Sequence, residues 1–344
     1  MKKIFVLIVF ISLIGCDKGN DKPKSDNQTN SSGTQITDIS AGRKGNTFTL
    51  NYNLVKGKDY KYKITSFSHQ VENVKSGDSS VTNKADQNAT YILDLKLDNI
   101  DKDGVYNLNC QISSINLDLN VNGMKESYKS GATSDSIVKK KFAQYDAIAN
   151  NDFGVRVNKT GEISEISRID QMTDKFLNEE GYADSVNQNQ KDQLRMRISE
   201  GIIRPIITQV FRELPKKSVG VDSTWSINQP KAEVLIFQSE NTMNYKLKSI
   251  KTSGSNKLAQ ISAGLSTSFE GKNTVTNNGV TYHFKKPKAE GSGEIVFNLT
   301  DGMLQNSKTT SKIEISFSAD LPTGKNKKGE KTSVTTVKNG VERI

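Results

Sequence analysis

The sequence contains only two histidines, His69 and His283, in 344 residues. Neither stands at a His-x-x-x-His or Cys-His spacing, so the chain lacks the parts of a zinc site or of a histidine-dependent triad. It also lacks a phosphate-binding Gly-rich loop with lysine and a Gly-x-Ser-x-Gly elbow. Residues 101–104 begin like a calcium loop, but Ile112 stands where such a loop needs a glutamate. We therefore expect a protein that is not an enzyme and has no cofactor or metal.

Cysteine is equally scarce, with Cys16 at the end of an apolar run and Cys110 inside an alternating strand pattern. Two cysteines in such different surroundings do not form a disulfide framework. Cys110 is accordingly expected to be an unreactive thiol in the core.

Arginine is also sparse, although the formal net charge is +10 at pH 7. A positive balance can indicate a nucleic acid or an anionic surface as the partner. The lysines are scattered through strands and turns, however, and arginine is the better reader of phosphates and bases. The charge therefore indicates the lysine-rich surface of an exported protein, and we expect no nucleic-acid partner.

One apolar run stands out, at residues 4–14, directly after Lys2 and Lys3. As a helix it would reach about 17 Å, whereas the hydrocarbon core of a bilayer is about 30 Å thick. The run is therefore too short to span a membrane comfortably. A basic start, a short apolar region and a small residue before a cut site are typical of a secretory signal peptide.

The end of this run, Leu13-Ile14-Gly15-Cys16, resembles the lipobox of bacterial lipoproteins. In that family the cysteine thiol receives a diacylglycerol, the signal peptidase cuts before the cysteine, and the new amine is usually acylated. The resemblance implies that residues 1–15 are removed and that Cys16 becomes the lipid anchor. Two or more acyl chains give stable anchoring. The alternative is a cleavable signal whose cut lies elsewhere, with Cys16 as a small apolar residue.

The rest of the chain divides by composition and pattern. Residues 16–46 contain few apolar residues beyond Cys16 and are expected to form a flexible tether. Beyond it we expect an α+β fold, built mostly of antiparallel β meanders in two related halves with a helical insertion between them. The boundaries are an N-terminal β unit at 47–168, the helical insertion at 169–215 and a C-terminal β unit at 216–320. Residues 321–344 form a Lys-rich tail, either disordered or with a last strand at 332–337.

Alternation of apolar and polar residues predicts the strands. The segment 48–54 places its apolar residues on one face, and the turn after it predicts a hairpin with a strand at 60–64. Between residues 106 and 121 the apolar set changes parity at Ser113-Ser114, which predicts a bulge. Asn122-Gly123 predicts a two-residue hairpin turn.

The two expected halves share a pattern. Residues 95–108 and 245–258 have the same spacing of apolar residues around Gly104 and Gly254. A second strand-turn-strand unit follows in each half, at 153–166 and 293–307. This recurrence predicts two related β units. The alternative is that any two hairpins share such a pattern.

The segment between the halves has helical periodicity, with apolar residues every four positions from Leu194 to Leu214. Pro205 lacks an amide hydrogen and would clash with the carbonyl of Gly201, which predicts a kink or break. The wide apolar face favours packing against a sheet, and a helix on a membrane surface is the alternative. Glu179 and Glu180 lie in a polar stretch and are expected to be solvated.

Residues 210–227, VFRELPKKSVGVDSTWSI, resemble a passage of an uncharacterised family of lipoproteins from Bacteroidetes-type bacteria. In that passage a helix ends at Leu-Pro and a strand leads to a Gly, an Asp and a Trp. Here Val221 intervenes between Gly220 and Asp222. The resemblance extends over most of residues 48–318 and implies export, lipidation and the fold, but no catalytic residue. Trp225 is interpreted as a core anchor, with ligand stacking as the alternative.

These features predict an exported bacterial lipoprotein, held on a membrane by its lipid after processing enzymes have acted on it. We expect the outer membrane, with the protein facing the periplasm or the cell surface. The expected function is a non-catalytic binding module for an unknown protein or glycan. The alternative is a periplasmic carrier in which a curved sheet and helices enclose a cavity for lipid or acyl chains. A carrier needs an unfilled apolar cavity, whereas a binding module has a filled core and an exposed patch.

The anchoring hypothesis is testable with Cys16→Ser. We expect the wild-type protein to partition into the detergent phase of a temperature-induced phase separation, because the attached acyl chains prefer micelles to water. The variant should remain uncut or stay in the aqueous phase, while Cys110→Ala should behave as wild type. Recovery of wild-type protein wholly in the aqueous phase, with an N-terminus other than residue 16, would contradict the hypothesis.

Overall fold

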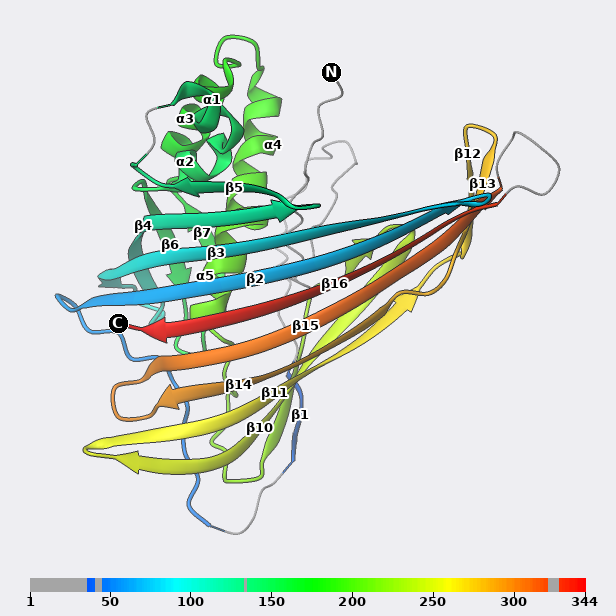
Figure 1. The fold of residues 1–344 in the computed structure, drawn as a ribbon. Helices are drawn as coiled ribbons and strands as arrows, with labels where there is room; N and C mark the ends of the chain where they lie inside the picture. Colours follow the sequence, from blue (N-terminus) through cyan, green and yellow to red (C-terminus); the bar gives the residue numbers. More distant parts are fainter. Residues whose placement is uncertain (1–35, 41–44, 133–134, 321–327) are drawn as a thin grey trace, which may run out of the picture.

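The computed structural model describes residues 36–40, 45–132, 135–320 and 328–344 (Figure 1). The lipobox residues Leu13, Ile14 and Gly15, together with Cys16, lie outside the described residues.

In these described residues, sixteen strands form a single sheet, and every strand pair is antiparallel. The strands are β1 (Ile36–Ser40), β2 (Asp59–Ser76), β3 (Ser79–Ile100), β4 (Tyr106–Val121), β5 (Met124–Lys129), β6 (Asp152–Val157), β7 (Ile163–Ser167), β8 (Thr224–Asn228), β9 (Ala232–Val234), β10 (Phe237–Ser253), β11 (Asn256–Glu270), β12 (Thr274–Asn277), β13 (Val280–Phe284), β14 (Lys288–Asn298), β15 (Met303–Asp320) and β16 (Lys328–Arg343). Their main order in space is β1-β8-β10-β11-β14-β15-β16-β2-β3-β4-β6-β7.

The expected α+β fold with two related halves is wrong. Strands from both expected β units lie in one open sheet, in which the helices are a minor part. The element that joins the units is β16, which pairs along its length with β15 on one side and with β2 on the other. This strand comes from the segment expected to be a lysine-rich tail. Local patterns do not reveal this arrangement, because β16 and β2 lie at opposite ends of the chain.

The recurring pattern corresponds to two equivalent hairpins, β3–β4 and β10–β11, each followed in space by two later strands of its own segment. The predicted bulge is confirmed: Leu93 pairs with Ile112 but Ile92 with Ser114, so Ser113 is the extra residue. The predicted turn is confirmed as well. Asn122 and Gly123 both have positive φ, 52° and 89°, as a tight hairpin of this hand requires.

The predicted hairpin between residues 48–54 and 60–64 is wrong. Leu50, Tyr52 and Leu54 are 0%, 1% and 3% exposed, so the apolar alternation correctly identified a buried face. The segment nevertheless forms no strand. Phe48 makes one isolated bridge with Val219, and the amide of Tyr52 donates to the carbonyl oxygen of Lys159 at 2.8 Å. The partners of β2 are β3 and β16 instead.

The helices cluster at one end of the sheet, beside β4 to β7 (Figure 1). They are α1 (Ser136–Lys141), α2 (Ala143–Ile148), α3 (Asp170–Glu180), α4 (Gln188–Ile198), a π-helical turn (Ser199–Ile203) and α5 (Arg204–Val210). The last four lie within the segment expected to be helical, whereas α1 and α2 were not expected. The kink or break expected at Pro205 takes a milder form. The backbone stays right-handed helical at Ile203 and Arg204, and a π-helical turn precedes α5, in whose first turn Pro205 stands.

Tyr52 is the centre of contact between the helices and the sheet. Its ring meets Phe211 and Phe297 edge-on, at centroid distances of 5.1 and 5.3 Å. Its hydroxyl lies 3.0 Å from the carbonyl oxygen of Val210 and 3.1 Å from that of Arg212, at the end of α5. A buried tyrosine is stable when its ring is packed and its hydroxyl has a partner. Tyr52 meets both requirements and so attaches α5 to the sheet.

We therefore predict that Tyr52→Phe lowers the free energy of unfolding by about 1 to 2 kcal/mol, because the change removes the only donor that this side chain offers to the buried carbonyls. Urea unfolding followed by circular dichroism would measure the difference. The matched control is Tyr182→Phe, since Tyr182 is 53% exposed. Equal unfolding midpoints for Tyr52→Phe and wild type would contradict this account.

Candidate functional site at the open end of the sheet

The long strands extend well past the helices. β2, β3, β15 and β16 run to a far end where the β12–β13 hairpin lies, which we call the open end (Figure 1). The burial of β2 changes along its length. Tyr60, Tyr62 and Ile64 are at most 2% exposed, whereas the residues from Thr65 to Glu72 are only partly buried. The main core therefore ends midway along the sheet.

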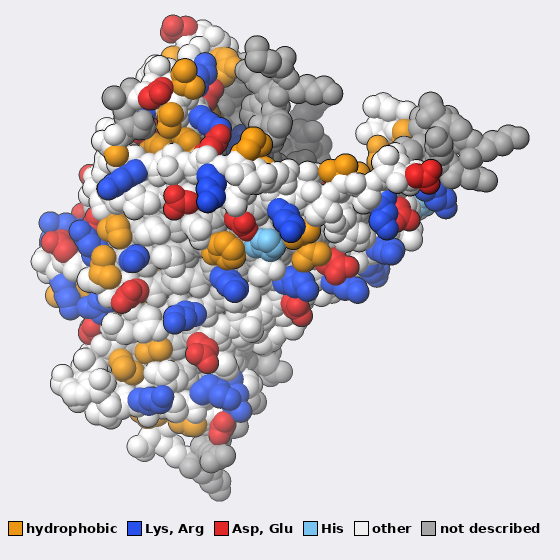
Figure 2. Space-filling model, viewed as in Figure 1, with side chains coloured by type: hydrophobic (Ala, Val, Ile, Leu, Met, Phe, Trp, Pro, Cys, Tyr) orange, Lys and Arg blue, Asp and Glu red, His pale blue; other side chains and the backbone are white. Residues whose placement is uncertain are grey.

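The two faces of the sheet differ in chemistry. We call the face that carries Tyr62 and Phe297 the inner face, since both are in the core. The opposite, outer face carries cross-strand ion pairs such as Lys61 with Asp94, 3.0 Å apart. Figure 2 shows basic and acidic side chains interspersed over the visible surface of the long strands. Such interspersed charges are typical of a solvated surface.

A second apolar cluster, separate from the main core, lies at the open end. Phe237, Phe269, Ile313 and Ala319 are buried, at 1%, 7%, 4% and 7% exposure. The half-buried rings of Tyr282, Phe284 and Phe317 adjoin them. We call these seven residues the open-end cluster. They converge because Phe284 pairs with Phe317, and Tyr282 with Ala319, across β13 and β15.

Four rings of the open-end cluster, those of Phe237, Tyr282, Phe284 and Phe317, contact one another. The centroids of Phe284 and Phe317 are 5.1 Å apart, and those of Tyr282 and Phe317 are 6.0 Å apart at an interplanar angle of 66°. Phe237 meets Phe284 edge-on at 6.5 Å. Edge-on and tilted pairs at these separations are the favoured aromatic geometries. The cluster therefore provides an ordered apolar wall.

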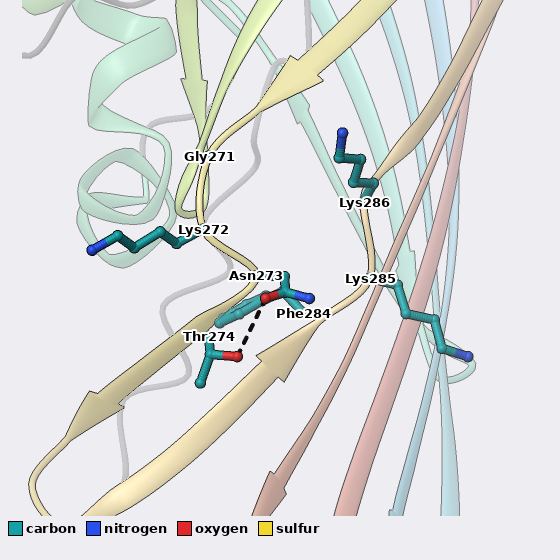
Figure 3. Close-up of a pocket in the computed structure, with 7 residues that line it drawn as sticks. All are labelled: Gly271, Lys272, Asn273, Thr274, Phe284, Lys285 and Lys286. Atoms are coloured by element: carbon teal, nitrogen blue, oxygen red, sulfur yellow. Dashed lines mark hydrogen bonds between the residues drawn. The ribbon is translucent and has the colours of Figure 1, made fainter.

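A pocket of about 690 Å³ adjoins this wall (Figure 3). Its lining comprises Gly271, Lys272, Asn273, Thr274, Phe284, Lys285 and Lys286. These residues come from the β11–β12 loop and the first residue of β12, and from the last residue of β13 and the loop after it. The amide of Phe284 donates to the carbonyl oxygen of Asn273 at 2.7 Å, which holds the two segments together.

Gly271 determines how closely the β9–β10 turn approaches this pocket. Its φ is +143°, and a Cβ added there would lie 2.8 Å from the carbonyl oxygen of Ile236. Any larger residue would therefore have to displace backbone. Only glycine lets the β9–β10 turn pack against the pocket in this way.

The charge of the pocket is entirely positive, because its lining contains three lysines and no acid. All three lysine side chains are exposed. In Figure 3 the ammonium group of Lys286 extends along the opening between the two pocket walls, whereas Lys272 and Lys285 point away on opposite sides. Lysine ammonium groups act as point charges that bind anions. The pocket can therefore bind a ligand that is apolar in one part and anionic in another.

Another ionisable cluster connects β5, α2 and α3. The hydroxyl of Tyr128 donates to Asp146 at 2.8 Å, and the Lys175 ammonium lies 2.8 Å from the same carboxylate. Burial and the neighbouring Asp146 charge raise the pKa of Glu179 to about 7. Contacts with Lys175 and Tyr128 outweigh burial and lower the pKa of Asp146. These groups interact chiefly with each other, so the cluster is a structural tie between elements.

The expectation that Glu179 is solvated is wrong, since its side chain is only 19% exposed. The two histidines also lie apart from each other. His69 pairs with Asp86 at 2.6 Å across β2 and β3, and His283 with Asp320 at 3.0 Å across β13 and β15. In the part of the chain that the structure describes, no group of three or more His, Cys, Asp or Glu side chains is arranged to hold a metal ion.

The remaining singled-out residues are in the core. Trp225 is 1% exposed and stacks on Tyr245 with centroids 5.4 Å apart, as its interpretation as a core anchor predicts. Cys110 is 1% exposed, and burial raises the pKa of its thiol, as expected for an unreactive core cysteine. Among the residues described, no helix has the length and apolar character needed to cross a membrane.

Sequence reasoning did not find the open-end pocket. Its residues come from two loops separated by a hairpin, and the only local signal was the sequence Tyr-His-Phe-Lys-Lys at 282–286, where two lysines follow two aromatic residues. The alternation of apolar and polar residues in β13 could have predicted the face of the strand on which Phe284 lies. The approach of Asn273 to Phe284 depends on the pairing of β13 with β12 and β15.

Comparison with known proteins places the chain in a family. Residues 103–304 match the model of DUF6263, a family of unknown function. The chain belongs to the DUF6263 family. The open-end pocket lies within the matched region, whereas Cys16 lies before it. No curated protein matches the chain.

Several solved structures are similar in a looser sense. A structure described as lipid–protein interactions in lipovitellin has 13% identity and a TM-score of 0.27, over 82% of this chain and 25% of that one. An outer membrane channel from Pseudomonas putida F1 has 7% identity and a TM-score of 0.20, over 85% and 98%. A DUF1329 family protein from Desulfovibrio piger ATCC 29098 has 8% identity and a TM-score of 0.12, over 81% and 85%. The chain thus spans a quarter of the lipovitellin chain, and none of these scores identifies a shared fold.

The tie around Glu179 makes stability depend on pH. Its pKa is raised from an ordinary 4.5 to about 7, so between these values the folded state holds a proton that the unfolded state has lost. The free energy of unfolding should therefore fall by about 3 kcal/mol as pH rises through this window, and level off above it. The pKa of Asp146 is lowered from 3.8, so its own contribution changes only below the window.

Urea unfolding at pH 5.5 and pH 8 would measure this dependence. Glu179→Gln should remove it and should unfold at a higher urea concentration than wild type at pH 8, because the like charge beside Asp146 is gone. The adjacent Glu180→Gln is the matched control and should keep the wild-type dependence. A wild type and a Glu179→Gln variant with the same pH profile would show that this proton is not held.

Proposed function

We propose that this protein is a membrane-anchored, non-catalytic binding protein that holds a small ligand at the open end of its sheet. The observation that supports this proposal best is the pocket of about 690 Å³ with Phe284 in its wall and Lys286 at its opening. Ligand sites are commonly concave, of about 300 to 1,000 Å³, and apolar with a few polar groups. The open-end pocket lies within this range of volumes, and its lining is more polar, with Phe284 as its large apolar side chain.

The absence of catalysis remains part of the proposal, and the placement of the ionisable groups supports it. His69 and His283 each pair with an aspartate on a neighbouring strand, at two separate places on the sheet. Asp146 and Glu179 interact with each other and with Lys175. Catalytic acids, bases and nucleophiles act together within reach of one substrate. In the described residues these groups face their own partners and not the open-end pocket.

Anchoring through Cys16 is the second part of the proposal. It rests on the lipobox Leu13-Ile14-Gly15-Cys16 and on the polar stretch that follows it. A lipid anchor and a flexible tether would hold the sheet close to a membrane while leaving it free to reorient. We propose the outer membrane of a bacterium as its location, facing the periplasm or the cell surface.

A carrier of lipid or acyl chains is the second candidate function, and the open-end cluster favours it. A carrier requires apolar surface where a chain can enter and leave. The main core is filled by side chains, with Tyr62, Leu93 and Ile206 at 0% exposure. The open end, by contrast, has half-buried aromatic rings beside a pocket. A ligand would therefore enter at the open end and not between the helices and the sheet.

Native mass spectrometry of the full-length protein, solubilised from its own membranes, would test the binding proposal. We expect a non-covalent mass on the wild-type protein in addition to any covalent lipid. Asn273→Trp should lose most of that mass, because an indole at this exposed lining position would obstruct the pocket beside Phe284 without removing a buried residue.

Ser255→Trp is the matched control. Ser255 is an exposed residue of the β10–β11 turn and lies outside the pocket lining. It should keep the non-covalent mass of the wild-type protein. A wild type without such mass, or an equal loss in both variants, would overturn the proposal.

A further inference from the structure

We infer that the ligand of the open-end pocket is an amphiphile, with one anionic headgroup beside Lys286 and an acyl chain against Phe284 and the inner face of β14. This inference rests on the proposed function, because it names the chemical class of the ligand for the same site. Three independent features lead to it: the charge at the opening, the aromatic wall, and a row of small residues on β14 that begins three residues after Lys286.

The charge at the opening selects an anion. Three lysines and no acid line the pocket, and Lys286 is the lysine that extends along its opening (Figure 3). An ammonium group acts as a point charge and can bind either a carboxylate or a phosphate. The planar guanidinium of arginine would instead favour bidentate hydrogen bonds to such a group. A fatty acid and a lysolipid phosphate share this chemistry, so the headgroup is defined by its negative charge.

The aromatic wall selects an apolar body. Phe284 lines the pocket and is itself in contact with Phe317 at 5.1 Å and Phe237 at 6.5 Å. The pocket wall is therefore continuous with the open-end cluster. A free anion such as inorganic phosphate would leave this wall in contact with water, whereas an acyl chain would cover it.

A row of small residues follows Lys286 on the inner face of β14. Ala289, Gly291 and Gly293 alternate on the side of β14 that pairs with Ile313, Ser311 and Thr309 of β15. All three small residues are only partly buried, and β14 reaches the core at Ile295. Between Lys286 and Gly293 a strand advances about 23 Å. That distance is enough for an extended acyl chain.

Glycine at two positions of this row leaves room for side chains of the neighbouring strands. A Cβ at Gly291 would lie 3.1 Å from the Cβ of Leu265 on β11, and one at Gly293 would lie 2.6 Å from the Cγ2 of Thr309 on β15. Leu265 thus leans over Gly291 from the neighbouring strand and provides a second apolar contact for a chain. The inner face of β14 combines small residues with apolar neighbours, while its outer face carries Lys288, Glu290 and Glu294.

Photo-crosslinking would test the inference. Membranes that contain the full-length protein would be treated with a long-chain fatty acid that carries a diazirine on its chain, or with the methyl ester of the same probe, and labelled peptides would be identified by mass spectrometry. We expect the acid to label the residues from Phe284 to Gly293. The ester should label them about tenfold less, because it lacks the charge that Lys286 binds.

Two lysine variants separate a specific contact from general positive charge. Lys286→Gln should reduce labelling by the acid about tenfold and leave the weak labelling by the ester unchanged. Lys285→Gln changes the charge by the same amount one residue away, on a side chain that points away from the opening, and should change labelling less than twofold. Circular dichroism of both variants should match wild type, since both lysines are exposed.

Three results would overturn the inference. The first is equal labelling by acid and ester, which would show that no headgroup is recognised. The second is an equal effect of Lys286→Gln and Lys285→Gln. The third is full competition by millimolar inorganic phosphate, which would show a site for a free anion without a chain. A non-covalent ligand in native mass spectrometry without labelling by the acid would leave the binding proposal standing and reject the amphiphile alone.

Discussion

The pairing of β16 with β15 and β2 is the constraint on which the rest of the fold depends. The last strand of the chain lies in the middle of the sheet, between a run of strands from the C-terminal segment and a run from the N-terminal segment. Without it, two long edges with unpaired backbone groups would face each other. The hydroxyl of Tyr62 on β2 donates to the carbonyl oxygen of Leu304, near the start of β15, at 2.9 Å. This hydrogen bond passes over β16, which lies between the two strands. β16 therefore joins the two runs of strands, and its Val341 is part of the core.

This arrangement also explains why the sheet has two unlike ends. The helices and residues 48–54 cover the inner face near Tyr52 and Tyr62, where the core residues are almost fully buried. The strands continue beyond this cover, and there the apolar residues form their own cluster around Phe284 and Phe317. A satellite cluster of this kind stabilises the strand ends only locally. The pocket is a consequence of strands that are longer than the layer packed on them.

Sequence periodicity predicted local structure well and pairing poorly. The bulge at Ser113 and the turn at Asn122-Gly123 are decided by neighbouring residues, and both predictions were confirmed. Alternation also identified the buried face of residues 48–54, but it could not show that this segment crosses the core without joining a strand. The last strand expected at 332–337 lies within β16. Its place in the middle of the sheet was not predicted, because a polar strand such as β16 owes its position to its neighbours.

The candidate site depended on pairing even more strongly. The aromatic and basic residues at 282–286 were visible in the sequence, but their opposition to Asn273 required the β12–β13 hairpin and its pairing with β15. The proposed anchor is the reverse case, since the lipobox is a contiguous motif read directly from residues 13–16. Contiguous motifs are available to sequence reasoning, whereas a pocket between loops becomes visible only with the fold.

The contrast between the two ends has a consequence for binding. At the helical end, Tyr128, Asp146, Lys175 and Glu179 connect three elements through charge-assisted contacts. At the open end, ring contacts, strand pairing and the exposed His283–Asp320 pair hold the β12–β13 hairpin against β15. Local stability is lowest where few buried contacts hold an element. A ligand that covers the aromatic wall would add apolar contacts to the open end. Binding of the ligand and ordering of the open end are therefore expected to reinforce each other.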